Sequence, residues 1–288
     1  NPIDRILFKF RDVKLIIKKS LMQMVIAFSG GFRRSVSQLV IASMLGLHIT
    51  GIYSFGISIS LIILVIPTTL VSILFPRDIK KFALENNKKI YHARIFEHSE
   101  KLAILASMLI GLMIIFTDIC ITFLLPKYLE GIIIYKLIFS GIIFTSISLL
   151  LSNPFLVMHE DIFLTRINVG ALVLTAVLSY SFVSFGLDLK YIALSVMFVE
   201  FTYTIILYLR LNLLCTNKIL LFDTFKILLK SIVIISISLF ISFIFNVKQY
   251  FWSELLFTFI KSAVYISLTI PLCFSLFKQI INKLSGRY

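Results

Sequence analysis

Apolar runs long enough to cross a lipid bilayer recur along almost the whole chain, and they restrict its fold more than any other feature. Eight runs of about 19 to 25 residues are separated by polar or charged connectors. About 20 helical residues cross the hydrocarbon core of a bilayer, where only helices and closed barrels satisfy their backbone polar groups. The composition agrees, because 59% of the residues are hydrophobic, 15% are charged and the mean hydropathy is +1.01. We therefore predict an all-α polytopic membrane protein with about eight transmembrane helices.

The boundaries of these runs can be placed to within a few residues. The predicted spans are 21–45, 51–75, 102–125, 132–152, 162–185, 191–209, 227–247 and 254–277. Residues 1–20 form a basic amphipathic lead-in, which we expect to lie on an anionic lipid leaflet. Pro67 should bend the second span and Pro76 should end it. The segment Arg77–Lys101 has no apolar run that could insert, so we expect it and its histidines to be solvated.

The basic residues are distributed unevenly between the two sides of this arrangement. Of the 28 Lys and Arg residues, 21 fall on the side of the N-terminus, four fall on the opposite side, and Arg33, Arg34 and Lys261 lie within spans. Cytoplasmic loops carry the excess of positive charge in membrane proteins. We therefore expect both termini of this segment in the cytoplasm. The net charge of +14 is then a topological signal, and we expect no nucleic-acid partner.

Arg33 and Arg34 lie at the middle of the first span, within the polar stretch Ser29–Gln38. At ~1.5 Å per residue they are roughly 18 Å from either end, too deep for their side chains to reach water. Each such charge costs about 2.5–3.5 kcal/mol unless it faces a water-filled cavity or a partner. We interpret the pair as part of a substrate site. The alternative is an interfacial break beside Gly30 and Gly31, in a segment that does not span.

Arg34, Ser37 and Gln38 are spaced to form one polar stripe on a helix, with Arg33 about 100° away. Two guanidinium groups suit a pyrophosphate, because each binds oxygens bidentately. We therefore predict that Arg33, Arg34, Ser37 and Gln38 bind an anionic substrate.

Two acidic residues, Asp118 and Glu200, also lie within predicted spans. Glu200 either exchanges a coupling proton or sodium ion or neutralises an arginine on a neighbouring helix. The same two alternatives hold for Asp118, and a structural pairing is favoured there. Lys261 either pairs with Glu200 or faces a junction between lobes. The His and Cys residues lack metal-ligand spacing, so we expect neither a metal nor a cofactor.

The chain also resembles the polysaccharide flippases. The resemblance is carried by Ser37-Gln-Leu-Val-Ile-Ala-Ser-Met-Leu-Gly46, Thr50-Gly-Ile-Tyr-Ser-Phe-Gly56, Leu74-Phe-Pro76, Leu125-Pro-Lys-Tyr128, Asn153 and Asn168. Their order and spacing over residues 10–215 are moderately specific. The chain departs from the family at Ser37-Gln38, where an Asp-Arg pair usually stands. Arg34, one turn earlier, could supply the positive charge.

The resemblance implies an O-antigen flippase of the Wzx type in the bacterial inner membrane. It belongs to the superfamily that also holds multidrug and toxin extrusion transporters. Residues 1–20 would connect two lobes, 21–213 would form the second six-helix lobe, and 214–288 would add a connector and two extra helices. The N-terminal lobe would then be missing, and this chain alone would not transport. The implied partners are a lipid-linked oligosaccharide, anionic lipid, coupling H⁺ or Na⁺, and the polysaccharide polymerase machinery.

Three alternative functions are compatible with the membrane-spanning pattern. The first is ion-coupled flipping of a polyprenyl-pyrophosphate-linked oligosaccharide, such as an O-antigen repeat unit. The second is multidrug cation antiport, which needs an acidic cavity, whereas the spans hold three basic residues against two acidic ones. The third is a membrane polymerase or ligase, which needs a large outer loop that the sequence does not provide. We therefore expect a transporter without catalytic residues.

Overall fold

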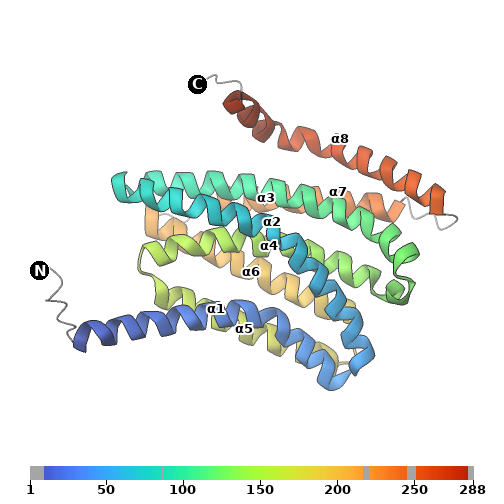
Figure 1. The fold of residues 1–288 in the computed structure, drawn as a ribbon, viewed down its shortest axis with the longest axis horizontal. Helices are drawn as coiled ribbons and strands as arrows, with labels where there is room; N and C mark the ends of the chain where they lie inside the picture. Colours follow the sequence, from blue (N-terminus) through green and yellow to red (C-terminus); the bar gives the residue numbers. More distant parts are fainter. Residues whose placement is uncertain (1–9, 86, 217–220, 245–250, 285–288) are drawn as a thin grey trace, which may run out of the picture.

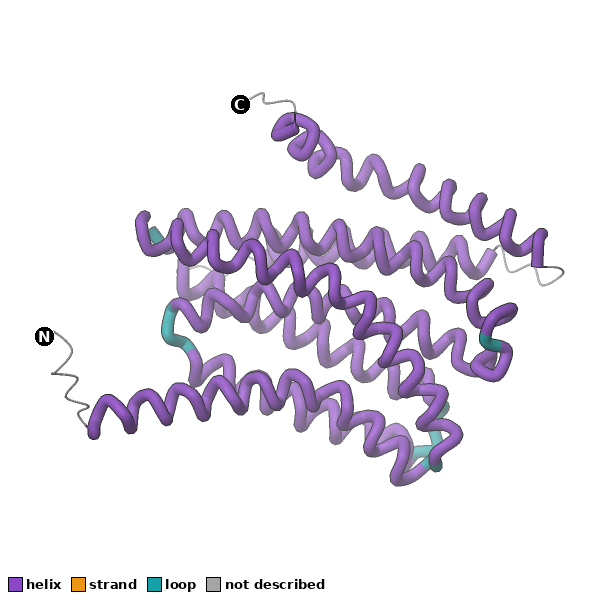
Figure 2. Tube along the Cα trace, in the orientation of Figure 1, coloured by secondary structure: helices purple, strands orange, loops and turns teal. Residues whose placement is uncertain are grey.

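The computed structural model describes residues 10–85, 87–216, 221–244 and 251–284, and within these ranges the predicted spans are helical almost throughout. The helices are α1 (Phe10–Met44), α2 (Leu47–Glu85), α3 (Lys88–Ile119), α4 (Ile132–Val157), α5 (Asp161–Ser184), α6 (Leu189–Thr216), α7 (Leu221–Ile244) and α8 (Phe251–Leu284). A π turn, Cys120–Leu124, and a 3₁₀ turn, Pro126–Gly131, join α3 to α4. These segments contain no strand, so the all-α fold is confirmed (Figure 2).

Successive helices run in opposite directions and pack in layers (Figure 1). α1 lies alongside α5, α4 packs most extensively on α6, and α3 packs on α4 and α7. α8 covers the outer side of α3 and α7. Because the helices alternate in direction, α1 begins and α8 ends at the same end of the bundle (Figure 1).

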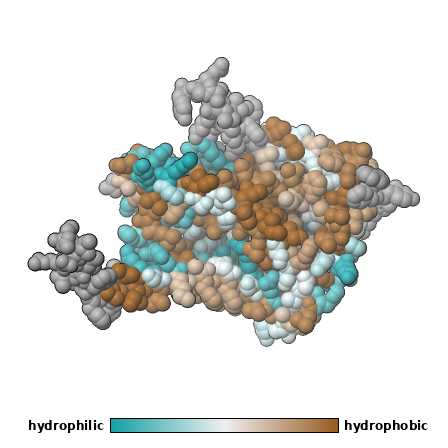
Figure 3. Space-filling model, viewed as in Figure 1, coloured by the Kyte–Doolittle hydropathy of each residue, from teal (hydrophilic) through white to brown (hydrophobic). Residues whose placement is uncertain are grey.

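The described helices include five that are long and apolar enough to cross a membrane, namely those from α2 to α6. Shorter apolar segments, Ile227–Phe243 and Leu255–Pro271, lie within α7 and α8. α1 is not among these five, and the polar stretch Ser29–Gln38 interrupts its apolar run. Apolar residues cover most of the face shown in Figure 3, and hydrophilic residues gather toward the end where α1 begins. The chain is a multi-pass membrane protein.

α1 and α2 continue beyond the boundaries predicted for them. The described part of the lead-in and the first span form one helix without a break, from Phe10 to Met44. The prediction that Pro76 ends α2 was wrong, since the helix passes both Pro67 and Pro76 and ends at Glu85. The hydroxyl groups of Thr68 and Thr69 donate to the carbonyls of Leu64 and Val65, which lie just before Pro67. Such bonds make proline tolerable in membrane helices.

The charged segment Arg77–Lys101 lies in α2 up to Glu85 and in α3 from Lys88, and it is partly buried, which corrects the expectation of a solvated connector. Asp78 is 2% exposed, and its Oδ2 lies 3.0 Å from Nδ1 of His98. His92 is also buried, with Nε2 2.7 Å from Oδ1 of Asn212 on α6. These side chains are covered because α2 and α3 extend as packed helices and α3 reaches α6. Polar pairing at this end therefore fixes the helices to one another.

Tight turns close two of the connections that bring the site helices together. Gly46 has φ +88° and ends α1, and Gly186 has φ +68° after α5. Glycine adopts this left-handed conformation without the steric cost of a Cβ atom. Asn87 begins α3 by accepting hydrogen bonds from the backbone N–H groups of Lys89 and Ile90.

Candidate substrate site

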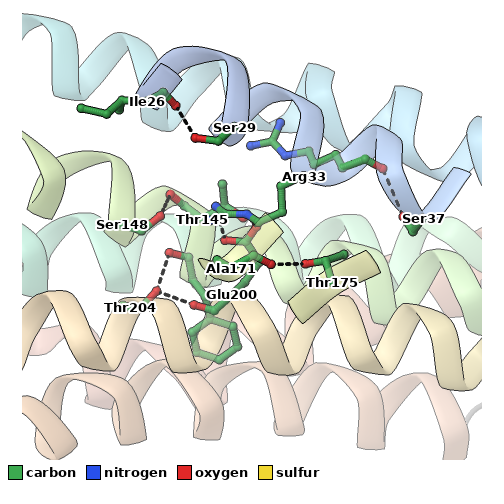
Figure 4. A network of polar contacts seen from close by, with 12 residues as sticks. Ile26, Ser29, Arg33, Ser37, Thr145, Ser148, Ala171, Thr175, Glu200 and Thr204 are labelled. Atoms are coloured by element: carbon green, nitrogen blue, oxygen red, sulfur yellow. Dashed lines mark hydrogen bonds and ion pairs between the residues drawn. The ribbon is translucent and has the colours of Figure 1, made fainter. Parts of the chain in front are cut away.

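A buried ion pair between Arg33 and Glu200 joins α1 to α6 in the bundle interior (Figure 4). Nε of Arg33 donates to Oε1 of Glu200 at 2.8 Å, and Nη2 donates to Oε2 at 3.0 Å. Both side chains are nearly inaccessible, with Arg33 4% and Glu200 3% exposed. This planar two-point contact is the strongest form of an arginine–carboxylate pair. Glu200 thus neutralises an arginine of a neighbouring helix, one of the two predicted alternatives.

The contact with Glu200 uses only some of the N–H groups of the Arg33 guanidinium. Its Cζ lies 4.5 Å from the centre of the Tyr203 ring, which gives a favourable cation–π contact. Its Nη1 is buried and has no hydrogen-bond partner among the described residues. An unpaired N–H group in the interior costs free energy until a ligand or a water binds it. The Nη1 group of Arg33 therefore remains available to donate a hydrogen bond.

Arg34 lines a small cavity between α1, α2, α4 and α6, and Glu200 is also in its wall. The cavity measures about 30 Å³, enough for about two water molecules. Apart from these two charged residues, Ser60 and Thr145 are the polar side chains among its described lining residues. No described residue forms a hydrogen bond or ion pair with the Arg34 guanidinium. A charged donor thus faces an internal space without a fixed partner.

The cavity in this conformation is too small for a pyrophosphate, which is larger than two water molecules. Binding of such a group requires α1 or α2 to move relative to α4 and α6. α1 packs less extensively on α2 and α6 than on α5.

Ser37 and Gln38 lie on different sides of α1. Ser37 is fully buried, and its hydroxyl donates to the Arg34 carbonyl at 3.1 Å and accepts from the Tyr53 hydroxyl at 3.2 Å. It shares the buried face with Arg33, whereas Gln38 is half-buried beside Arg34. The single polar stripe predicted for Arg34, Ser37 and Gln38 is therefore divided between two faces.

The polar stripe that follows Glu200 on one face of α6, made of Tyr203, Thr204 and Tyr208, is buried. Tyr203 is 5% exposed, and Thr204 and Tyr208 are fully buried. The Thr204 hydroxyl donates to the carbonyls of Phe144, at 3.0 Å, and Glu200, at 2.8 Å (Figure 4). The Tyr208 hydroxyl donates to Ser99 on α3 at 2.7 Å. This stripe fixes α6 against α3 and α4 and so holds Glu200 in place.

Asp118 is engaged elsewhere in the bundle. Its carboxylate lies 2.6 Å from Nζ of Lys136 on α4 and 2.6 Å from the Ser242 hydroxyl on α7. Lys136 also donates to Ser242 at 2.6 Å, which closes a three-residue cluster. Lys261 belongs to α8, which packs on α3 and α7, whereas Glu200 pairs with Arg33. Asp118 has the structural partner that was favoured for it, and Lys261 is not the partner of Glu200.

Sequence reasoning missed Ser60, Thr145 and Tyr203 as neighbours of the two arginines. Single hydroxyl residues within apolar runs are common in membrane helices and give no signal of their own. Only the packing of α2, α4 and α6 brings these three to α1. No known protein family, curated protein or solved structure matches the chain.

Proposed function

We propose that this chain forms part of a flippase that moves a polyprenyl-pyrophosphate-linked oligosaccharide across the bacterial cytoplasmic membrane. One observation carries the proposal, namely that Arg34 lines an internal cavity without an ion-pair partner. A cation in the interior of a membrane protein is a costly feature, and it is retained where it serves an ion or substrate pathway. An arginine selects for phosphate groups, because its fork binds two oxygens at once.

The distribution of charge around the cavity favours an anionic substrate over a cationic one. The Glu200 carboxylate forms an ion pair with Arg33, and the Asp118 carboxylate forms one with Lys136. Arg34 is thus the uncompensated charge of the cavity, and it is positive. A multidrug cation antiporter needs a free carboxylate at this place, so we rank that function second.

The proposed transport includes two further elements. The helical bundle described above acts as one lobe and works against a second lobe, which the resemblance to polysaccharide flippases implies. The cavity widens to admit the pyrophosphate, while the oligosaccharide passes through the hydrophilic space between the lobes. An enzymatic function is not part of this proposal.

The proposal predicts that Arg34→Ala abolishes export of the surface glycan, whereas Arg34→Lys retains part of it. Lysine keeps the charge but loses the two-point fork. The protein should be expressed from its complete gene in a flippase-deleted host, and surface glycan measured with protein abundance. Arg166→Ala is the matched control, because this arginine is exposed on α5. Normal glycan display from Arg34→Ala at normal abundance would refute the substrate role.

A further inference from the structure

An apolar groove lies between α5, α6 and α7, on another side of α6 from the Arg34 cavity. It measures about 530 Å³, within the roughly 300–1,000 Å³ that is typical of ligand pockets. Among the described residues, only Met197 lines both spaces. The groove exists because α7 packs extensively on α3 but only slightly on α4 and α6.

The walls of the groove offer no binding group to a polar ligand. Ser195 is the only described lining residue with a side-chain oxygen or nitrogen, and its hydroxyl already donates to the Ile192 carbonyl at 2.8 Å. Apolar spaces of this kind exclude water and take up apolar molecules. The aromatic part of the wall consists of Phe144, Phe182, Phe198 and Phe201. The occupant that fits these walls is therefore a hydrocarbon.

The groove opens on the outer surface of a helix that crosses the membrane. Phe198 is 56% exposed and Leu194 is 41% exposed, and both line the groove. Phe144, by contrast, is 4% exposed and forms an edge contact with the Phe201 ring deeper in the bundle. A lipid chain beside α6 can therefore enter the groove without any helix moving.

The depth of the groove in the bilayer matches one leaflet. An exposed ion pair, Asp188 with Lys190, lies at the beginning of α6 and marks the bilayer surface there. At ~1.5 Å per residue, Leu194 lies about 6 Å below Lys190 and Phe201 about 16 Å below it. One half of the hydrocarbon core is roughly 15 Å thick. The groove thus runs from just below the surface to the middle of the bilayer.

We propose that this groove binds one acyl chain of a phospholipid, from the leaflet at the end of the bundle where α6 begins. An acyl chain is favoured over the polyprenyl tail of a carrier, because the groove ends at the depth where the chain of a single leaflet ends. The bound chain fills the space between α6 and α7 and adds packing contacts that α7 lacks. The head group remains at the surface, since no lining residue offers it a charge. The inference is independent of the proposed transport, because it involves neither Arg33 nor Arg34.

A single tryptophan at the mouth of the groove tests the inference. Trp252→Phe removes the only native tryptophan, and Phe198→Trp then places the fluorophore in the groove. The purified chain in detergent is titrated with a phosphatidylcholine that is brominated along one acyl chain, because bromine quenches tryptophan only at short range. The matched control is Val173→Trp on α5, which is 54% exposed and does not line the groove. We expect half-maximal quenching of Phe198→Trp at a lipid fraction about tenfold lower than for Val173→Trp.

Competition identifies the occupant. Phosphatidylcholine without bromine should restore the fluorescence of Phe198→Trp, and the same lipid with chains half as long should restore less, because it does not reach Phe201. A phosphatidylglycerol with the same brominated chain should give the same quenching curve as the phosphatidylcholine, since the groove holds no charged side chain.

Three outcomes would overturn the inference. The first is one quenching curve for both tryptophan positions, which would mean that the groove exchanges lipid like any other surface of the bundle. The second is fluorescence restored by a polyprenyl phosphate but not by phospholipid, which would assign the groove to the carrier. The third is a strong preference for one head group. Should Phe198→Trp fail to fold, Leu194→Trp replaces it, because Leu194 also lines the exposed mouth of the groove.

Discussion

Arg33 and Arg34 are neighbours in the sequence but have different surroundings in the bundle. Arg33 points to α6 and binds Glu200, and Arg34 lines the cavity without a partner. Their difference arises from the 100° rotation between successive residues of a helix. A single turn of α1 thereby presents one neutralised and one available positive charge. The available one carries the proposed substrate contact.

The buried ion pair makes a prediction about stability. Arg33→Gln or Glu200→Gln alone should lower the stability of the chain by about 3–5 kcal/mol, because each leaves a buried charge without its partner. The double variant should lose clearly less than the sum of the two single changes. Thermal unfolding in detergent, followed by circular dichroism, measures all four proteins. Additive losses would mean that the two side chains do not interact.

At the scale of elements, α3 is the support on which the last two helices are fixed. The Lys230 ammonium pairs with Glu100 in the first half of α7, and Ser242 bonds to Asp118 and Lys136 near its C-terminal end. Tyr265 of α8 donates to the Ser107 carbonyl at 3.0 Å. α7 and α8 are thus held to α3 by side-chain contacts along its length.

The contact between α3 and α8 depends on a glycine. A Cβ atom added to Gly111 would lie 1.9 Å from the Tyr265 hydroxyl oxygen and 2.3 Å from its Cζ. Gly111→Ala should therefore displace the fully buried Tyr265 ring and lower the melting temperature. Adding Tyr265→Leu should recover part of that loss, because the shorter side chain leaves room for the new methyl group. Gly170→Ala is the control, since open space surrounds that site; an equal loss from both glycine changes would contradict the prediction.

At the scale of the whole molecule, the alternating helix directions determine which connections share a side. The turn between α2 and α3 lies at the end where α1 begins, and the turns between α3 and α4 lie at the opposite end (Figure 1). Most of the basic residues outside the spans belong to the first of these ends. By the positive-inside rule, that asymmetry predicts that this end faces the cytoplasm.

The orientation can be tested by labelling cysteines in intact cells. In a protein without native cysteines, Glu85→Cys should resist a membrane-impermeant thiol reagent, and Lys127→Cys should react with it. Removing the native cysteines matters because Cys120 is exposed near the same end as Lys127. Labelling of Glu85→Cys in intact cells, with cytoplasmic controls unlabelled, would reverse the proposed topology.

The helices themselves could be predicted from the sequence, because apolar runs of this length have no other structure available in a bilayer. The partner of Glu200 could not, since helical periodicity places Arg33 and Arg34 on adjacent faces but does not give the rotation of α1 against α6. The end of α2 could not be predicted from Pro76 for a similar reason. A proline weakens a helix locally, but hydroxyl side chains and packing on neighbouring helices decide whether the helix ends. Sequence spacing also left open that Asp118 meets Lys136 and Ser242.

Because α1 is one unbroken helix from Phe10 to Met44, a movement at one of its ends also moves the other. At ~1.5 Å per residue, Arg33 lies about 20 Å from the turn at Gly46, and Lys18 lies about 22 Å further out. A tilt of about 5° around that turn would move the Arg33 guanidinium by roughly 2 Å, enough to break its hydrogen bonds to Glu200. The part of α1 around Lys18 would move about twice as far, in the same direction. Any force that a lipid surface exerts on this N-terminal part of α1 would therefore change the geometry of one ion pair.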